Sequence, residues 1–140
     1  MKTDISTTTD LDVCLALRRR VFIEEQGVSE AEEIDGLDDE AVHLLARIDG
    51  HAVGTARLLL RGETGKIGRV CVLREARGTG LGVALIKAAL AHLRARGGIR
   101  EARLSAQSHA IGFYERLGFT PEGAEFLDAG IPHRHMRRAL

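Results

Sequence analysis

A glycine-rich turn between an apolar stretch and a helical pattern constrains this chain more than any other feature. Residues 77–82 read Arg-Gly-Thr-Gly-Leu-Gly; the apolar residues 70–73 precede them, and a helical pattern covers 83–96. Glycine lets backbone N–H groups approach a ligand closely, and the first turn of a helix leaves several N–H donors without intrahelical partners. The helix dipole adds a preference for negative charge. The sequence therefore predicts a strand, a turn and a helix that together bind a phosphate or diphosphate.

Two common phosphate-binding patterns fit this turn poorly. A P-loop has Lys and then Ser or Thr after its last glycine, whereas Val83 follows Gly82 here. The dinucleotide fingerprint has its third glycine three residues after the second, and the spacing here is one residue short. Glu101 could still supply the acidic ribose contact of that fingerprint, so the dinucleotide interpretation remains an alternative.

A third pattern, Arg-x-x-Gly-x-Gly, is met by Arg77, Gly80 and Gly82. At this motif the sequence resembles the GNAT superfamily of acetyl-CoA-dependent N-acetyltransferases, in which the element binds the diphosphate of coenzyme A. Taken alone, the motif could also be an ordinary strand-to-helix connection. Residues 110–119 add a second motif, because they resemble the closing helix of that superfamily, with Phe-Tyr in the helix and Leu-Gly-Phe at its end. Gly118 suits the left-handed residue that ends a helix.

The resemblance covers nearly the whole chain. Residues 17–28 are similar to the amino-terminal pattern of the ElaA-type branch, and residues 125–136 to its carboxy terminus. Glyphosate N-acetyltransferase is more distantly similar, with a comparable Pro-His-x-x-Met ending. The resemblance implies one N-acetyltransferase domain over residues 1–140, with acetyl-CoA as co-substrate, an amine acceptor and no metal. Homodimers are common in the superfamily.

The expected fold is mixed α/β, with a mostly antiparallel central sheet of about seven strands flanked by helices. The resemblance implies that two central strands splay apart and that the thioester arm lies in the gap. The pattern predicts strands at 2–7, 41–48, 52–61, 65–73, 100–106, 119–126 and 133–138, and helices at 10–26, 83–96 and 109–117. The expected apolar stripes are Leu11, Leu15, Val21 and Phe22 on the first helix, and Leu81, Leu85, Ala88, His92 and Leu93 on the second.

The resemblance implies coenzyme contacts along the central strand and the turn. They are Val70, Cys71, Val72, Arg77, Gly78, Thr79, Gly80, Leu81 and Gly82, with Gln107 in place of the asparagine that many members carry. An extended pantetheine arm can pair with strand backbone as an added strand does, and a bulge there would aim one N–H at the thioester oxygen. Ordinary core strand explains the same apolar letters equally well.

Acetyl transfer needs a general acid for the leaving thiolate and a base for the amine. Tyr114 is the expected acid, because the pKa of a phenol, roughly 10, is close enough to that of an alkyl thiol for proton transfer. The alternative is that Tyr114 is half buried and only packs its ring in the core. His133 is the expected base, because the resemblance gives its Pro-His histidine that role and imidazole titrates near neutrality. His135, two residues on, would face the same way. Other candidates for the base are His43, Glu25 and Glu33, acting through water.

For the acceptor, Arg20 is the expected contact with a carboxylate or phosphate, and Arg69 is the second candidate. Arg18 and Arg19 adjoin Arg20, so a solvated helix face is the alternative. A protein or peptide amine as acceptor would need an open acidic groove, for which the loop supplies Glu30, Glu32, Glu33, Asp35, Asp38, Asp39 and Glu40. A non-catalytic acetyl-CoA-binding module is the further alternative.

Composition excludes several function classes. Twenty basic and twenty acidic residues cancel, which argues against a protein that binds nucleic acid through its phosphates. No apolar run approaches the roughly 20 residues of a membrane span, and the start lacks a signal-peptide profile. Cys14 and Cys71 are the two cysteines and are expected as buried free thiols of a cytoplasmic protein.

Overall fold

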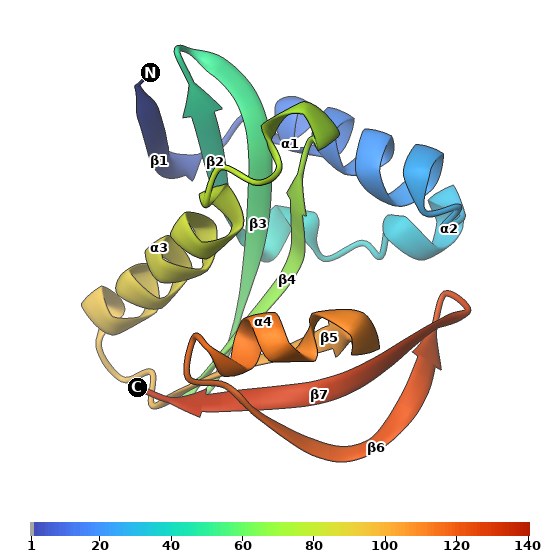
Figure 1. The fold of residues 1–140 in the computed structure, drawn as a ribbon. Helices are drawn as coiled ribbons and strands as arrows, with labels where there is room; N and C mark the ends of the chain where they lie inside the picture. Colours follow the sequence, from blue (N-terminus) through green and yellow to red (C-terminus); the bar gives the residue numbers. More distant parts are fainter. Residues whose placement is uncertain (1) are drawn as a thin grey trace.

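In the computed structural model, residues 2–140 form a seven-stranded, mostly antiparallel sheet flanked by helices (Figure 1). The strand order in the sheet is β1-β2-β3-β4-β5-β7-β6. The strands are β1 Thr3–Thr8, β2 Val42–Ile48, β3 His51–Arg61, β4 Thr64–Val72, β5 Glu101–Gln107, β6 Thr120–Asp128 and β7 Ile131–Ala139. The α-helices are α1 Leu11–Arg18, α2 Glu30–Glu33, α3 Leu81–Arg96 and α4 Ile111–Glu115. The predicted mixed α/β class is confirmed.

Short helical segments complete the chain. A π-helical segment, η1 Arg19–Glu25, continues α1, and 3-10 turns lie at η2 Asp38–Glu40, η3 Arg74–Ala76 and η4 Ser108–Ala110. The expected single helix over 10–26 is therefore divided. Asp10 caps it as predicted, accepting from the Val13 N–H at 3.4 Å. A π-helical turn contains more residues than an α-helical one, so a period of 3.6 cannot follow the buried face through it.

The sheet opens between its two central strands. β4 and β5 are parallel and pair only at 64–66 with 101–103, after which they diverge. Figure 1 shows β1–β4 rising away from β5–β7 on either side of this seam. The splayed arrangement that the resemblance implied is confirmed, and the open side of the V faces the end of β4 that leads into the glycine-rich turn.

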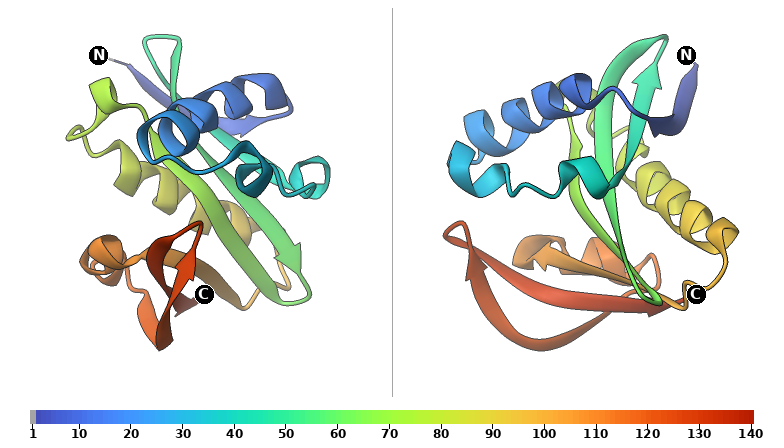
Figure 2. Two further views of the ribbon diagram at one scale, coloured as in Figure 1. Left: turned by 90° about the vertical axis from the view of Figure 1, so that its right-hand side faces the viewer. Right: turned by 180° about the vertical axis from the view of Figure 1, so that it is seen from behind.

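Two hydrophobic clusters hold α1 and α3 on opposite faces of the sheet (Figure 2). On one face, Cys14, Leu17 and Val21 pack against Leu45 and Cys71. The predicted stripe on the first helix was therefore partly wrong, because Leu11 and Leu15 are only half buried and the residues facing the sheet are Cys14, Leu17 and Arg18. The buried Arg18 is the reason that an apolar stripe does not describe this face.

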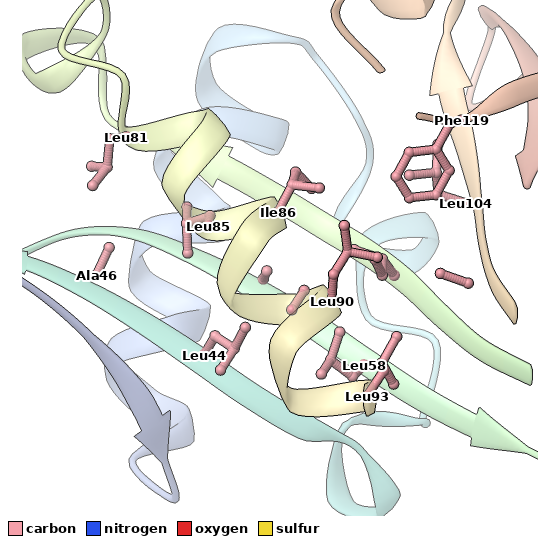
Figure 3. Packing of buried hydrophobic residues seen from close by; sticks show 14 of the residues in the cluster. Leu44, Ala46, Leu58, Leu81, Leu85, Ile86, Leu90, Leu93, Leu104 and Phe119 are labelled. Carbon is pink, nitrogen blue, oxygen red and sulfur yellow. The ribbon is translucent and has the colours of Figure 1, made fainter. Parts of the chain in front are cut away.

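The other face belongs to α3. Leu85, Ile86, Leu90 and Leu93 of this helix belong to one buried cluster with Leu44, Ala46 and Leu58 on β2 and β3 (Figure 3). The expected stripe had Ala88 and His92 in place of Ile86, Ala89 and Leu90. Apolar residues occur on most sides of this helix, so the sequence pattern predicted its existence and its last residue, Arg96, better than its buried face.

The predicted hairpin between β2 and β3 is confirmed. Asp49 and Gly50 both have positive φ, at 49° and 82°, as a tight hairpin turn of this type requires. Gly118 has φ 89° and ends α4, as its place after Leu117 predicted.

Candidate active site

A cavity of about 470 Å³ occupies the region where β4 and β5 diverge. Its walls come from six parts of the chain: η1, the loop around α2, β3, β4, the end of β5 with α4, and the turn between β6 and β7. Val70, Gln107, Tyr114, His133 and Arg69 all line it. Residues far apart in the sequence therefore meet at one cavity, at the place that the splayed strands create.

The glycine-rich turn follows the open end of β4, is not among the residues that line the cavity, and has the expected backbone geometry. Gly78 and Gly80 adopt φ of 78° and 81°, and Gly80 is the N-cap of α3. A Cβ on either residue would meet open space, so the need for glycine is conformational. Ala84 donates to the Gly80 carbonyl at 3.1 Å, which leaves the first-turn N–H groups of Leu81, Gly82 and Val83 directed out of the helix end. Such a turn suits a diphosphate.

Arg77 and Thr79 flank the turn. The Nε of Arg77 donates to the Val72 carbonyl at 3.0 Å and its Nη2 to Glu25 at 2.8 Å. The Thr79 hydroxyl donates to the Ala76 carbonyl at 2.7 Å, which fixes the loop. Glu25, an alternative base from the sequence, is therefore an ion-pair partner of Arg77 in this structure.

β4 contains a bulge at the cavity. Thr55 on β3 pairs with Cys71, and Arg57 on β3 pairs with Gly68. Between these two pairs β4 advances by three residues while β3 advances by two, so β4 contains one extra residue. Within residues 2–140, Arg69 and Val70 have no register partner on β3 or β5. Arg69 has φ 50°, a left-handed conformation that is uncommon for a residue other than glycine. The bulge adjoins Val70, Cys71 and Val72, where the resemblance implied backbone contacts to the coenzyme arm.

Tyr114 lies in an apolar part of the cavity wall. Its ring packs edge-on against Phe113 at 5.0 Å and Phe119 at 6.0 Å between centroids. Burial raises the pKa of its phenol to about 12, since the apolar surroundings disfavour the anion. The sequence expectation of an ordinary phenol pKa was therefore too low, and the hydroxyl stays protonated at neutral pH.

The three candidate histidines have different surroundings. The Nδ1 of His133 lies 2.6 Å from the Ile131 carbonyl; as the donor there, it leaves Nε2 with the free lone pair. His133 is buried and lines the cavity. His135 is exposed, bonds the Ser105 hydroxyl through Nδ1 at 3.0 Å and stacks on Phe126. His43 is buried with its Nε2 2.9 Å from the Asp38 carbonyl, outside the cavity lining.

Gln107 lies at the end of β5 and spans the opening of the V. Its Nε2 donates to the Gln26 Oε1 at 3.0 Å, and its Oε1 is 2.9 Å from the His109 ring. This amide is therefore at the cavity, as a coenzyme contact would need, and it joins β5 to the end of η1.

The candidate acceptor arginines separate in the structure. Arg20 is exposed, pairs with Glu75 at 3.2 Å and does not line the cavity, so its role in acceptor binding stays a prediction. Arg69 lines the cavity, and its Nη2 donates to the Glu33 carbonyl at 3.0 Å and to Asp35 at 3.2 Å. Arg57 also lines the cavity and was missed by the sequence analysis. The sequence does contain one indication of this residue, because Arg57 stands between apolar residues in β3.

The comparisons with known proteins agree with this geometry. The model of the acetyltransferase (GNAT) domain family matches residues 8–140. This chain is a GNAT acetyltransferase. The acetyltransferase is 39% identical over 132 and 123 residues to two Bacillus subtilis proteins, the second named uncharacterized N-acetyltransferase YjcF, and covers 87% of that relative. Its fold matches an acyl-CoA N-acyltransferase from Pseudomonas aeruginosa with TM-score 0.88 and 35% identity over 99% of this chain and 100% of the other. Escherichia coli ElaA matches with TM-score 0.86 and 29% identity over 98% of this chain and 99% of ElaA.

Membership makes this acetyltransferase an acyltransferase that uses acetyl-CoA or another acyl-CoA. The structure offers features that fit this co-substrate: positive-φ glycines before α3, first-turn amides directed outward, and strand backbone at the bulge without a register partner among the described residues. Over residues 2–140, none of the helices combines the length and apolarity of a bilayer span.

Proposed function

We propose that residues 1–140 form one N-acetyltransferase domain that moves the acetyl group of acetyl-CoA to the primary amine of a small molecule by direct attack. The observation that carries the proposal is the gap between β4 and β5, which opens after three register pairs and has Tyr114 among the residues that line its cavity. A cavity of about 470 Å³ suits a small acceptor together with the thioester end of the donor.

Main-chain groups do most of the donor binding. The amides of residues 81–83 and the glycine-rich turn bind the diphosphate, and the guanidinium of Arg77 is a second contact for this anion. Backbone groups of Val70, Cys71 and Val72 pair with the extended arm, and Gln107 contacts it from β5. The Val70 N–H is the donor proposed for the thioester oxygen, since the bulge leaves this residue without a strand partner among residues 2–140.

Tyr114 gives its proton to the departing thiolate. Because the pKa of the phenol is about 12, Tyr114 carries its proton at neutral pH. A thiol in water has a pKa of about 8.5, so complete transfer would be uphill by roughly 5 kcal/mol in free-solution terms. The thiolate leaves into the same apolar region, which raises its own pKa and narrows this gap.

His133 removes the proton from the ammonium group of the acceptor. Its Nδ1 contact with the Ile131 carbonyl fixes the ring and directs Nε2 as the acceptor of a proton, directly or through one water. His43 and the carboxylates of Glu25 and Glu33 remain the alternatives for this role. Their contacts to the Asp38 carbonyl, Arg77 and Arg18 occupy them in this structure.

Direct attack is favoured over a cysteine-linked route. Both cysteines of the described chain are buried free thiols. Burial raises the pKa of Cys71 to about 12 and also raises that of Cys14. A protonated, buried thiol is a weak nucleophile.

A small acceptor is favoured over a protein or peptide amine. The loop that could have supplied an open acidic groove has Glu33, Asp35 and Asp38 turned inward against arginines. The cytoplasmic location and the absence of a metal stay predictions from the sequence, and only the family resemblance suggests a homodimer. The non-catalytic binding module remains the alternative that the following experiment separates.

The test is a titration of the protein with acetyl-CoA, followed by a panel of amines, amino acids, polyamines and aminosugars with thiol release as the readout. Saturable acetyl-CoA binding and thiol release with at least one amine are expected. His133→Gln should lower that rate by about 10²-fold or more, whereas His135→Gln, its exposed neighbour, should not. Binding without release for any amine would favour the non-catalytic module, and no binding at millimolar acetyl-CoA would overturn the proposal.

A further inference from the structure

Six charged side chains form one ion-pair network beside the cavity, and the proposed reaction does not use their charges. Three are guanidiniums and three are carboxylates: Arg18, Arg57 and Arg69, with Glu33, Asp35 and Asp38. Of these, Arg18, Glu33 and Arg57 are almost fully buried. Buried charges are stable only when they are paired and hydrogen-bonded, so these positions are strongly coupled to one another.

The network joins three separate parts of the chain. Arg57 on β3 forms a two-point contact with Asp35, with Nη1–Oδ1 and Nη2–Oδ2 both at 2.8 Å, and reaches Asp38 at 3.2 Å. Arg18 at the end of α1 donates to Glu33 and, at 2.7 Å, to Asp38. The loop around α2 is thereby fixed to α1 and β3. The guanidinium of Arg57 holds the pKa of Asp35 well below its usual range, so this carboxylate stays charged.

Arg69 connects this network to the bulge. Its Nε and Nη2 donate to the Glu33 carbonyl at 3.3 and 3.0 Å, and Nη2 also donates to Asp35 at 3.2 Å. Arg69 is the bulge residue with φ 50°, and Arg57 is the register partner of Gly68, the residue before it. The side chain that pairs with the loop thus belongs to the residue with the strained backbone.

A left-handed non-glycine residue persists only where its surroundings determine its conformation. Here Asp35 contacts both arginines, one from each of the two strands, β3 and β4, whose pairing contains the bulge. The next residue is Val70, whose N–H is the proposed donor to the thioester oxygen. Its direction depends on the ψ of Arg69, and therefore on where the Arg69 side chain is held.

We propose that Asp35, Arg57 and Arg69 are positioning residues, which keep the β4 bulge in the conformation that aims the Val70 N–H at the thioester oxygen. The inference rests on the proposed function, because it assigns a task to the donor site described there. It gives the loop around α2 a role in polarising the acetyl group, although Asp35 and Arg57 do not touch that group themselves.

The test reads the thioester carbonyl directly and needs no acceptor. The protein is saturated with acetyl-CoA labelled with ¹³C at the carbonyl, and the carbonyl resonance is compared with that of free acetyl-CoA, while the coenzyme Kd is measured by calorimetry. Wild type should displace the resonance, because an N–H donor polarises the carbonyl. Asp35→Asn and Arg57→Lys should lose about half of that displacement or more, with a coenzyme Kd close to wild type, since the glycine-rich turn is untouched.

Two further variants keep the result decisive. Arg69→Gly tolerates the positive φ and removes the side-chain contacts, so it should fold and still lose the displacement. Arg19→Ala removes the exposed pair with Glu30 at 2.8 Å and should retain it fully. A purely structural network would lower the melting temperature of the variants while the bound resonance stayed at its wild-type position, and that result would overturn the inference. Failure of wild type to bind acetyl-CoA would overturn the proposed function as well.

Discussion

Replacing Arg18 with methionine tests how much the buried network contributes to stability. Arg18 donates to two carboxylates, Glu33 and Asp38, and only about 1% of its surface is exposed. Removing one partner of a buried ion pair typically costs about 3–5 kcal/mol, because a charge is left buried without its partner. Here Arg57 still reaches Asp38 at 3.2 Å and Arg69 approaches Glu33 at 3.5 Å, and methionine restores apolar packing. The expected loss is therefore at the lower end, about 3 kcal/mol.

This free energy converts to a large thermal shift. An unfolding entropy of about 2.1 cal/mol/K per residue, over the 140 residues of this chain, gives a decrease in Tm of about 10 °C. Arg19→Met is the matched control, since Arg19 is the next residue and pairs with Glu30 at 2.8 Å, with half of its side chain exposed. An exposed pair contributes about 0–1 kcal/mol, so the control should shift Tm by less than about 3 °C.

The difference in Tm between wild type and Arg18→Met should also depend on pH. Burial alone would raise the pKa of Asp38, but hydrogen bonds and charge from Arg18 and Arg57 outweigh it and hold that pKa below its ordinary value. A carboxylate with a depressed pKa stabilises the fold above its unfolded pKa of about 3.9, and this stabilisation is lost as pH falls through the folded pKa. As pH falls below about 4, wild type progressively loses the stabilisation that the Arg18→Met variant already lacks, so the two Tm curves should begin to converge there.

Differential scanning calorimetry of wild type, Arg18→Met and Arg19→Met between neutral pH and pH 3.5 provides the measurement. Equal Tm shifts for the two variants at neutral pH would refute the reasoning from burial. A deficit in Arg18→Met that stayed constant down to pH 3.5 would refute the assignment of the loss to the buried carboxylates.

Three further predictions concern the seam, the acid and the turn. Gly65→Ala should destabilise the fold by about 1–3 kcal/mol in denaturant titrations, because its Cβ would lie 2.4 Å from the Leu93 Cδ2, whereas Gly68→Ala, with open space around it, should cost less than about 1 kcal/mol. Tyr114→Phe should lower kcat by roughly 10²–10⁴ with little change in the KM for acetyl-CoA, and a normal rate would remove Tyr114 as the acid. Gly80→Ala should weaken acetyl-CoA binding in calorimetry, since its φ of 81° is strained for alanine; an unchanged Kd would exclude the turn from the donor site.

Local chemistry in the sequence predicted the elements well. The Asp49-Gly50 hairpin, the glycine-rich turn before α3 and Gly118 at the end of α4 each require a backbone conformation that few residues adopt, so their positions follow from residue identity. The splay of β4 and β5 could be predicted through the family resemblance. The buried faces of α1 and α3 could not be predicted, because α3 is apolar on most sides and the π-helical segment changes the helical period after Arg18.

Some candidate site residues share one cavity in the structure. Tyr114, Gln107 and His133, which the resemblance named, all line it, and their roles stay predictions. The network around Arg57 could not be predicted, because it depends on which residue of β3 lies opposite the bulge and on how the loop around α2 folds back. A run of acidic residues in a sequence usually indicates a solvated surface, and nothing in its letters shows that some of these carboxylates turn inward.

The short seam between β4 and β5 has a consequence for how such enzymes diversify. Because three register pairs join the two halves of the sheet, the angle between them depends on a few contacts at the narrow end, where Gly65 lies against Leu93. A change of side-chain volume there would widen or narrow the V while the diphosphate-binding turn kept its form. Descendants of one ancestral chain could thus acquire room for bulkier acyl groups through substitutions remote from every reacting atom.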